Sequence, residues 1–368
     1  MTGFVPPIYP YERLEGAKAK AAAHDGGVVD LSIGTPCDPP ARVVLDALAA
    51  SNAERGYPPS VGTARLREAA AAWMARRLGV DVAPAAVAAC IGTKEFVGTL
   101  PQWLKLRTPD RDTILYPAVA YPTYEMGATL AGVRAVAVPQ DEHFRLRLDA
   151  IDPADAARAL ALWMNTPGNP AGQLDDLDAA AAWGRTHGVP VFSDECYVEF
   201  TWDGPPRTIL SSGVEGVVAV HSLSKRSNFA GARIGFYAGD PDLVHYLGEV
   251  RKHVGMMVPG PVQAAGAAAL DDDAHVDAQR EVYRRRLERF RAILAAVGVD
   301  APRPQGGFYL WAAAPGGDAW GLAERLAADG GVLVAPGDIF GAAGAGYIRA
   351  ALVQPDDRID LVARRLGV

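Results

Sequence analysis

The chain has 368 residues, 49% of them hydrophobic, and carries a formal net charge of −7 with a sequence pI near 5.5. This length allows one large domain or two linked ones, and the acidic balance argues against a surface for nucleic acid or an anionic membrane. No basic start followed by a long apolar run is present, so we expect neither a secretory signal nor a membrane span. Cys37, Cys90 and Cys196 lack the spacing of a metal site or a disulfide framework, which fits a reducing cytoplasm. We therefore expect a cytoplasmic enzyme without a metal.

Apolar runs alternate with alanine-rich stretches from about residue 28 onward. The spacing of apolar residues predicts helices over 42–53, 64–79 and 176–188. Seven short apolar runs that end in polar or glycine-containing turns predict strands over 86–92, 112–117, 133–139, 158–165, 190–195, 216–224 and 233–240. Because these runs are continuously apolar and alternate with helices, we expect an α/β fold whose mostly parallel seven-stranded sheet is covered by helices on both faces.

The pattern changes after about residue 260. A long charged amphipathic helix is expected over 277–298, and a shorter helix near 318–329. The apolar stretches GGFYLWAA, GVLVAPG and YIRAAL alternate with them, which is an α+β pattern. We therefore expect a large domain over 35–265 and a smaller α+β domain formed by 1–34 together with 266–368.

Several widespread catalytic motifs are absent from the sequence. There is no GxxxxGK[ST], no GxSxG, no HExxH and no strand–GxGxxG–helix unit. The hypotheses of a P-loop nucleotide enzyme, a serine hydrolase and a zinc protease therefore lose their main support.

Polar groups follow the carboxyl ends of the expected strands, where open α/β sheets gather their chemistry. Thr93 and Lys94 follow a glycine turn and begin a helix, which is either an ordinary turn or a phosphate site built from free N–H groups. NTPGNPAG (165–172) is a rigid turn that can present an amide side chain. SDECY (193–197) places Asp194 and Tyr197 three residues apart. An acid at the end of a buried strand needs a cationic partner or strong hydrogen bonds.

The stretch HSLSKRSNFAGAR, residues 221–233, holds one of only six lysines in a chain with thirty arginines. Lys225 is either a surface residue of a polar turn or a partly buried amine nucleophile, a role that the permanently protonated arginine cannot fill. Pyridoxal phosphate would use all the strand-end groups. It needs an amine for its aldehyde, an anion for its pyridinium nitrogen, and donors for its phosphate and phenolic oxygen. The sequence therefore predicts this cofactor.

In order and spacing, NTPGNPAG, SDECY and HSLSKRSNFAGAR resemble the signatures of class I/II pyridoxal-phosphate aminotransferases of fold type I. IGTKE, AYPTY, GFYLW, VAPGDIFG and YIRAAL extend the resemblance across nearly the whole chain, and alanine in place of threonine in NTPGNPAG is a small departure. The resemblance implies that Lys225 is the Schiff-base lysine and that it also carries the proton between Cα and C4′. It also implies that Asp194 keeps the pyridine nitrogen protonated, and that Asn169 and Tyr197 bind the phenolic oxygen.

The resemblance implies further contacts to the cofactor and the substrate. The phosphate would be held by Thr93, Lys94, Ser222, Ser224 and Arg233. Tyr121 would stack on the cofactor, and Tyr57 would reach the phosphate of the neighbouring subunit, which implies a homodimer with composite sites. Arg349 would grip the substrate α-carboxylate, with Gly34 and Asn169 also lining the substrate. A guanidinium fork suits a carboxylate in this role.

The whole-chain pattern, including VDLSIGTPCDPP, SDECYVEF and VRKHVGMMVPGPVQAA, is similar to actinobacterial succinyl-diaminopimelate aminotransferases. This implies a ping-pong exchange between glutamate and N-succinyl-2-amino-6-oxopimelate in lysine and diaminopimelate synthesis. Arg226, Arg251, Lys252 and His253 are candidates for the far carboxylates of that substrate. The alternatives are an aspartate, alanine or aromatic aminotransferase, and a pyridoxal-phosphate β-lyase on the same scaffold. A transcriptional regulator would need a DNA-binding module, for which the first family motif, near residue 31, leaves no room.

Overall fold

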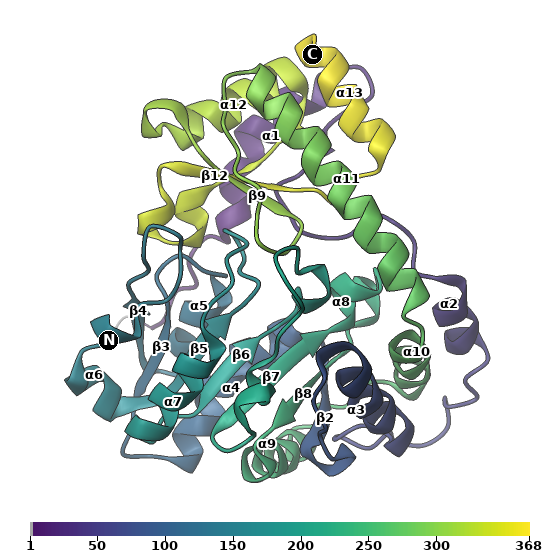
Figure 1. The fold of residues 1–368 in the computed structure, drawn as a ribbon, viewed down its shortest axis with the longest axis vertical. Coiled ribbons are helices and arrows are strands. Elements are labelled where there is room, and N and C mark those ends of the chain that lie inside the picture. The colour runs from purple at the N-terminus through teal and green to yellow at the C-terminus, as the bar shows by residue number, and fades with distance from the viewer. Residues whose placement is uncertain (1–2) are drawn as a thin grey trace. The chain divides into compact units, whose positions relative to one another are not determined.

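The computed structural model describes residues 3–368. Contacts between Cα atoms divide this part of the chain into two compact units. The larger unit comprises Thr35–Val282 and Gln305–Gly307, and the smaller unit comprises the residues up to Gly34, Tyr283–Pro304 and Phe308–Val368. Figure 1 labels most of the helices and strands of the two units. Within residues 3–368, no helix is both long and apolar enough to cross a membrane.

Among the described residues, seven strands of the larger unit form one mixed sheet in the order β2-β8-β7-β6-β5-β3-β4. The strands are β2 (Val87–Cys90), β3 (Thr113–Pro117), β4 (Arg134–Val138), β5 (Ala159–Asn165), β6 (Val191–Asp194), β7 (Val217–Ser222) and β8 (Gly235–Gly239). Each lies inside one of the expected apolar runs. Since β4, β3, β5, β6 and β7 pair in parallel, the prediction of a mostly parallel sheet is confirmed. Only β8, among these strands, runs antiparallel to its neighbours β2 and β7.

Side chains of the sheet alternate between two hydrophobic layers, as the period of two in a strand requires. Trp163, Phe192 and Val218 lie in one layer with the helices α4 (Thr93–Arg107), α5 (Thr123–Leu130) and α9 (Pro241–His253). Met164 and Val191 lie in the other layer with α3 (Ala64–Leu78), α7 (Leu177–His187) and α10 (Gly260–Asp271). Both faces of the sheet are therefore buried, which explains why its inner strands read as continuous apolar runs.

The helix ends of the larger unit follow capping rules. Thr63 accepts a hydrogen bond from the backbone N–H of Leu66 at the start of α3, and α3 ends at Gly79 in the left-handed region. Asp176 caps α7 in the same way, and α7 ends at Gly188. These bounds confirm the expected helices at 64–79 and 176–188. The remaining helices of this unit are α2 (Arg42–Ala49), α6 (Pro153–Arg158) and α8 (Leu223–Arg226).

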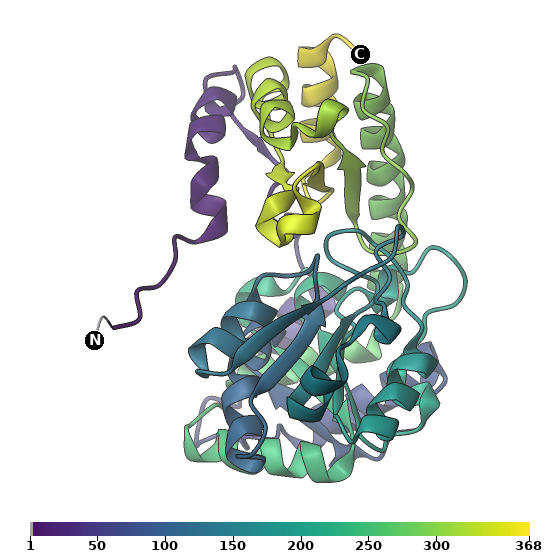
Figure 2. The same ribbon diagram turned by 90° about the vertical axis from the view of Figure 1, so that its left-hand side faces the viewer.

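The smaller unit is an α+β assembly around two short sheets of described residues. β9 (Tyr309–Ala313), β12 (Tyr347–Ala351) and β11 (Ala335–Pro336) form an antiparallel sheet, and β1 (Val29–Asp30) pairs in parallel with β10 (Val332–Leu333). GVLVAPG therefore divides between two sheets. The helices are α1 (Glu15–Ala22), α12 (Ala319–Gly330) and α13 (Asp356–Leu366). Ahead of them, exposed residues 3–9 extend away from the rest of this unit, as Figure 2 shows.

The second boundary between the units falls inside α11 (Ala274–Ala296), at residue 282, and differs from the expected boundary near residue 265. The reason is the packing of α10. Ala265, Ala269 and Leu270 of this helix are buried in the same hydrophobic cluster as α3. The change from an α/β to an α+β sequence pattern therefore precedes the change of unit.

Gly127 of α5 lies directly against α4, and this contact generates a stability prediction. A Cβ at residue 127 would lie 2.9 Å from the carbonyl oxygen of Val97. Such overpacking costs about 1–3 kcal/mol, and the gain in helix propensity offsets about 1 kcal/mol of it, so Gly127→Ala should lower the free energy of unfolding in urea by up to about 2 kcal/mol. Gly98→Ala is the matched control, because its Cβ would lie 3.6 Å from Thr123. Alanine also favours a helix over glycine by about 1 kcal/mol. Equal losses of stability in both variants would contradict this packing account.

Candidate active site

The polar strand-end residues meet at one edge of the large sheet. Asn165, which ends β5, is paired with Asp194, which ends β6. Gly235, which begins β8, is paired both with Cys90 at the end of β2 and with Ser222 at the end of β7. Because β8 is antiparallel, its first residue lies at the edge where its neighbours end. This explains why a residue that precedes a strand, Arg233, lies with residues that follow strands.

Asp194 is the centre of a buried hydrogen-bonded cluster. The Tyr124 hydroxyl donates to Asp194 Oδ2 at 2.8 Å, and the backbone N–H of Cys196 donates to Oδ1 at 3.2 Å. Thr93 Oγ1 lies 3.3 Å from Cys196 Sγ, which connects the start of α4 to the same cluster. Asn165 Nδ2 donates to the Asp194 carbonyl oxygen at 2.9 Å and so ties two strand ends together.

Burial controls the electrostatics of this cluster. Burial raises the pKa of Asp194, although hydrogen bonds from Cys196 and Tyr124 and the charge of Lys225 oppose the rise. Burial and the neighbouring carboxylate also raise the pKa values of Tyr124 and Cys196, so both remain neutral donors. Asp194 is therefore a carboxyl group whose ionised form gains from a nearby cation, which is the environment that a protonated pyridine nitrogen needs.

The adjacent pair Glu195 and His221 adds no charge to this environment. Burial raises the pKa of Glu195 to about 8 and lowers the pKa of His221 to about 3. Both side chains are therefore neutral near pH 7. Their nearest atoms, Glu195 Oε2 and His221 Nε2, lie 3.6 Å apart. Asp194 is thus next to a neutral pair rather than a second carboxylate.

The start of α4 and the start of β8 form a candidate anion cradle. Gly92 has φ +73°, a positive value that favours glycine, and it precedes α4, which begins without a side-chain cap. A Cβ at residue 92 would lie 2.7 Å from the Arg233 guanidinium carbon, so with any other residue the Arg233 side chain would have to shift. Ser222 and Ser224 are buried, and the Ser222 hydroxyl accepts from the Ser224 N–H at 3.1 Å. Together with Thr93 and Lys94, these groups suit a phosphate.

The larger unit also contains the other residues predicted to contact the cofactor. Lys225 is half-buried in α8, next to Ser224 and close enough to Asp194 to lower its pKa. Asn169 and Tyr197 are buried. The Tyr121 ring meets the Tyr124 ring edge-on at 6.1 Å between centroids, and Lys94 Nζ lies 6.0 Å from the centroid of Tyr121.

Arg349 and Gly34 belong to the smaller unit. Arg349 is 1% exposed on β12, with its guanidinium carbon 4.4 Å from the ring centroid of Tyr309 and 4.5 Å from that of Phe340. Its Nη2 donates to the carbonyl oxygen of Ser32. A Cβ at Gly34 would lie 2.9 Å from the Tyr309 ring, so glycine is required there by the ring. The rings hold a flat guanidinium in place, which suits bidentate contact with a carboxylate.

Tyr57 lies in the larger unit and is 96% exposed. Its expected contact with the phosphate of a neighbouring subunit stays a prediction.

Two of the four candidates for the far carboxylates are wrong. Arg226 is 3% exposed, and its Nε donates to Glu199 Oε1 at 3.1 Å. Arg251 is 1% exposed and makes two hydrogen bonds to Glu95, at 2.6 and 2.8 Å. Both guanidinium groups are held in internal ion pairs, so neither matches the mobile cation expected for a distant substrate carboxylate. Lys252 and His253 are exposed at the end of α9.

Sequence reasoning missed Tyr124 and Cys196. Both belong to motifs that were examined, AYPTY and SDECY, and both hold Asp194. Tyr124 is the second residue of α5, whereas Tyr121 precedes the helix, and the two rings meet edge-on. The sequence shows two tyrosines close together but not which of them donates to Asp194.

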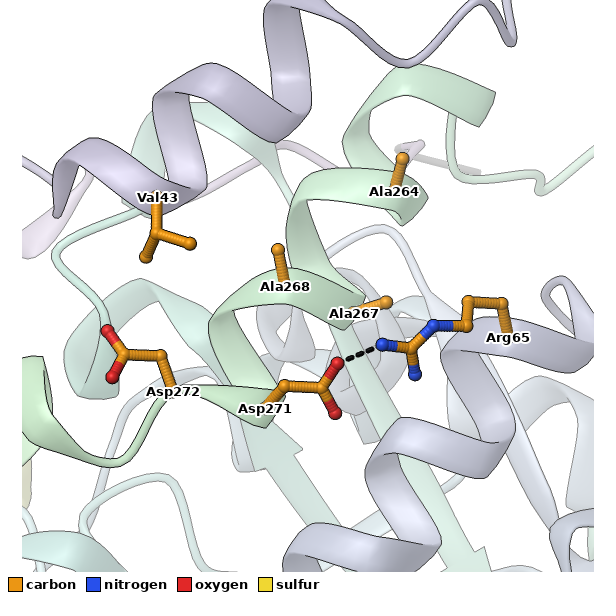
Figure 3. Close-up of a pocket in the computed structure, with 7 residues that line it drawn as sticks. All are labelled: Val43, Arg65, Ala264, Ala267, Ala268, Asp271 and Asp272. Carbon is orange, nitrogen blue, oxygen red and sulfur yellow. Dashed lines mark hydrogen bonds and ion pairs between the residues drawn. The ribbon is translucent and has the colours of Figure 1, made fainter.

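The larger unit also has a surface hollow of ≈ 770 Å³, shown in Figure 3. It is lined by Val43, Arg65, Ala264, Ala267, Ala268, Asp271 and Asp272. Alanine methyl groups of α10 form much of the lining, and Arg65 is paired with Asp271. None of the strand-end residues lines it, so it is not the candidate site. Among residues 3–368, no group of three or more His, Cys, Asp and Glu side chains could hold a metal ion.

The chain matches the family of class I and II aminotransferases over residues 26–366, and it belongs to this family. It is 44% identical to 4-dedimethylamino-4-oxo-anhydrotetracycline transaminase OxyQ of Streptomyces rimosus, over 98% of this chain and 99% of that one. It is 45% identical to a probable aminotransferase of Mycobacterium tuberculosis, over 98% of this chain and 85% of that one. A solved structure of a probable N-succinyldiaminopimelate aminotransferase from Thermus thermophilus matches with a TM-score of 0.88 and 32% identity, over 97% of this chain and 99% of that one.

The protein is therefore a pyridoxal-phosphate-dependent aminotransferase of fold type I. The residues present fit the cofactor. Asp194 is a buried acid beside neutral donors, and the glycine at residue 92 leaves space for a guanidinium at the start of α4.

Tyr124→Phe tests the cluster around Asp194. Removing one hydrogen bond to a charged group costs about 1.5–3 kcal/mol, so kcat should fall by about tenfold or more. The tyrosine hydrogen bond lowers the pKa of Asp194. Its loss should raise that pKa further and move the acid limb of the pH–rate profile to higher pH. Tyr116→Phe, at a half-buried tyrosine of β3, is the control. An unchanged kcat and pH profile in Tyr124→Phe would contradict the role of Tyr124.

Proposed function

We propose that the protein exchanges an amino group between glutamate and N-succinyl-2-amino-6-oxopimelate, forming N-succinyl-LL-diaminopimelate in cytoplasmic lysine and diaminopimelate synthesis. The observation that most supports aminotransferase chemistry is the buried Asp194, which accepts a hydrogen bond from Tyr124. It lies at the same edge of the sheet as Lys225 and the anion cradle. The choice of substrate is supported by the likeness to the Thermus thermophilus enzyme and by the whole-chain sequence pattern.

When bound, pyridoxal phosphate supplies an electron sink for the electron pair left at the substrate Cα. In this proposal, Lys225 would contribute the amine that holds the cofactor aldehyde, and would carry the proton released from the substrate Cα. Asp194 would keep a proton on the pyridine nitrogen. Asn169 and Tyr197 would donate to the phenolic oxygen, and Tyr121 would contact the cofactor ring.

Two charged anchors would orient cofactor and substrate. The anion cradle of Thr93, Lys94, Ser222, Ser224 and Arg233 would hold the phosphate. Arg349 would bind the α-carboxylate with its guanidinium fork, whose plane is fixed by the rings of Tyr309 and Phe340. Gly34 and Asn169 would line the substrate. Both substrates present the same α-amino or α-keto carboxylate, so one anchor would serve both half-reactions.

A second candidate function is favoured by the 44% identity to OxyQ over nearly the full length of both chains. In this alternative, glutamate donates its amino group to the ketone of 4-dedimethylamino-4-oxo-anhydrotetracycline. That acceptor is rigid and polycyclic, whereas the succinylated pimelate is a flexible chain with several carboxylates. The two candidates therefore require pockets of different shape and charge, and direct assays distinguish them.

We further propose a homodimer with composite sites, in which Tyr57 reaches the phosphate bound by the partner chain. The 96% exposure of Tyr57 supports this, as does the prevalence of closed two-fold pairs. Light scattering at assay concentration should give a mass near twice 38.8 kDa. Tyr57→Phe should weaken cofactor binding without changing that mass. A fully active monomer would contradict the proposal.

The assignment of Lys225 predicts a specific covalent label. Borohydride reduction of the holoenzyme followed by peptide mapping should place the pyridoxyl group on Lys225. Lys225→Ala should lose the visible absorbance of lysine-bound cofactor, because its side chain has no amine. Lys94→Ala is the control and should keep the label on Lys225. A label on Lys94 in the wild type would overturn the assignment.

The proposed substrate predicts an order of amino donors. With 2-oxoglutarate as acceptor, N-succinyl-LL-diaminopimelate should exceed diaminopimelate, phenylalanine, alanine and aspartate in kcat/KM by about tenfold, or about 1.4 kcal/mol of transition-state preference. Lys225→Ala measures the background rate. An advantage of that size for phenylalanine or aspartate would replace this substrate. Efficient transfer from glutamate to the oxo-anhydrotetracycline alone would instead establish the second candidate.

A further inference from the structure

We propose that Glu95 and Arg251 form a positioning pair for the anion cradle. Glu95 fixes the first turn of α4, and Arg251 holds Glu95 while cancelling the negative charge that Glu95 brings close to the bound phosphate. This inference rests on the proposed function, because it concerns the same phosphate position.

The contact between the two side chains is a two-pronged ion pair. Arg251 Nη1 donates to Glu95 Oε1 at 2.6 Å, and Nη2 donates to Oε2 at 2.8 Å. Burial lowers the pKa of Arg251, but the hydrogen bond and charge of Glu95 outweigh this effect and raise it overall. The guanidinium therefore stays charged, although it is 1% exposed and lies 5.7 Å above the ring of Phe96. The pair joins the last turn of α9 to the first turn of α4.

The Glu95 carboxylate binds the turn that precedes α4. Glu95 is the third residue of α4, and its Oε2 accepts from the Ile91 N–H at 3.2 Å, while Oε1 accepts from the Thr99 hydroxyl at 3.1 Å. In an ordinary capping box, a cap side chain would also satisfy an N–H of the first turn. Here the cap is Gly92, which has no side chain. Glu95 therefore fixes the turn around Gly92 from within the helix, without a side chain at the cap position.

Without Arg251, the Glu95 carboxylate would repel a phosphate bound in the anion cradle. Cys90, at the end of β2, lies beside the start of α4: a Cβ at its strand partner Gly235 would lie 3.2 Å from both Cys90 Sγ and Thr93 Cγ2. Burial, Glu95 and Asp194 raise the pKa of the Cys90 thiol, whereas Arg251 and Arg233 lower it. The pair and the cradle arginine therefore act on one buried position. Removing Arg251 would leave Glu95 as an uncompensated anion next to the phosphate position, and like charges at such a distance disfavour binding.

The test compares ligands with and without a phosphate on full-length apoenzyme. Pyridoxal 5′-phosphate, pyridoxal and inorganic phosphate are titrated separately into wild type, Arg251→Met, Glu95→Gln and the double variant, and Kd is measured for each. Arg251→Met should weaken pyridoxal 5′-phosphate by about tenfold, or about 1.4 kcal/mol, and weaken inorganic phosphate similarly. Pyridoxal should change by less than about twofold, because it has no phosphate.

The other two variants separate charge from general damage. Glu95→Gln keeps an acceptor for the Ile91 N–H and removes the anion that cancels the Arg251 charge, so phosphate-containing ligands should bind more tightly than to wild type. The double variant should recover affinity to within about threefold of wild type. A merely structural role predicts instead that both single variants weaken every ligand. That pattern, or an unchanged affinity in Arg251→Met, would overturn the proposal.

The test still decides if Arg251→Met misfolds or if wild type does not distinguish the ligands. If Arg251→Met does not fold, Arg251→Lys keeps a charge without the two-pronged contact, and it should weaken only the phosphate-containing ligands, by about threefold to tenfold. Equal weakening of pyridoxal in Arg251→Lys would overturn the proposal. If wild type binds pyridoxal 5′-phosphate no better than pyridoxal, the phosphate site itself is refuted, and the proposed function fails for a reason independent of the pair.

Discussion

The buried carboxyl group of Asp194 is the constraint on which the site depends. A carboxylate without a cationic partner is disfavoured inside a protein, and burial accordingly raises the pKa of Asp194. Neutral donors surround it: the Tyr124 hydroxyl at 2.8 Å and the Cys196 N–H at 3.2 Å. These hydrogen bonds and the charge of Lys225 do not offset the effect of burial on the pKa of Asp194, and a bound protonated ring nitrogen would add a further cation. The neutral pair of Glu195 and His221 beside it adds no second carboxylate charge.

Strand direction brings the rest of the site to this acid. The parallel strands deliver the residues that follow their carboxyl ends, and antiparallel β8 delivers Arg233, which precedes its first residue. Gly92 lies where α4 begins, with a positive φ that favours glycine, and the Arg233 guanidinium packs against it. Glu95 and Arg251 then hold that turn from within α4 and α9. Backbone direction, one glycine and one ion pair thus combine in the proposed anion cradle.

The sheet and many of the strand-end groups were predictable because they leave local patterns. Strands buried on both faces read as apolar runs, and capped helices such as α3 and α7 end at glycine. Other features depend on partners distant in sequence. The pairs of Arg226 with Glu199 and of Arg251 with Glu95 overturned their assignment to a substrate, and the second pair spans 156 residues. GVLVAPG contributes to two sheets because β1 and β12 pair with different parts of it. The positions of Tyr57 and Arg349 came from a family resemblance, and their roles stay predictions.

The half-reaction with glutamate alone tests the central claim about Asp194 most directly. Wild type and Asp194→Asn holoenzymes are mixed rapidly with glutamate, without a keto acid, and loss of the absorbance of lysine-bound cofactor is followed. A neutral amide cannot keep the pyridine nitrogen protonated, so the variant should fold but react about 100-fold more slowly or worse, a barrier about 2.7 kcal/mol higher. A folded variant that reacts within about threefold of the wild-type rate would contradict the account.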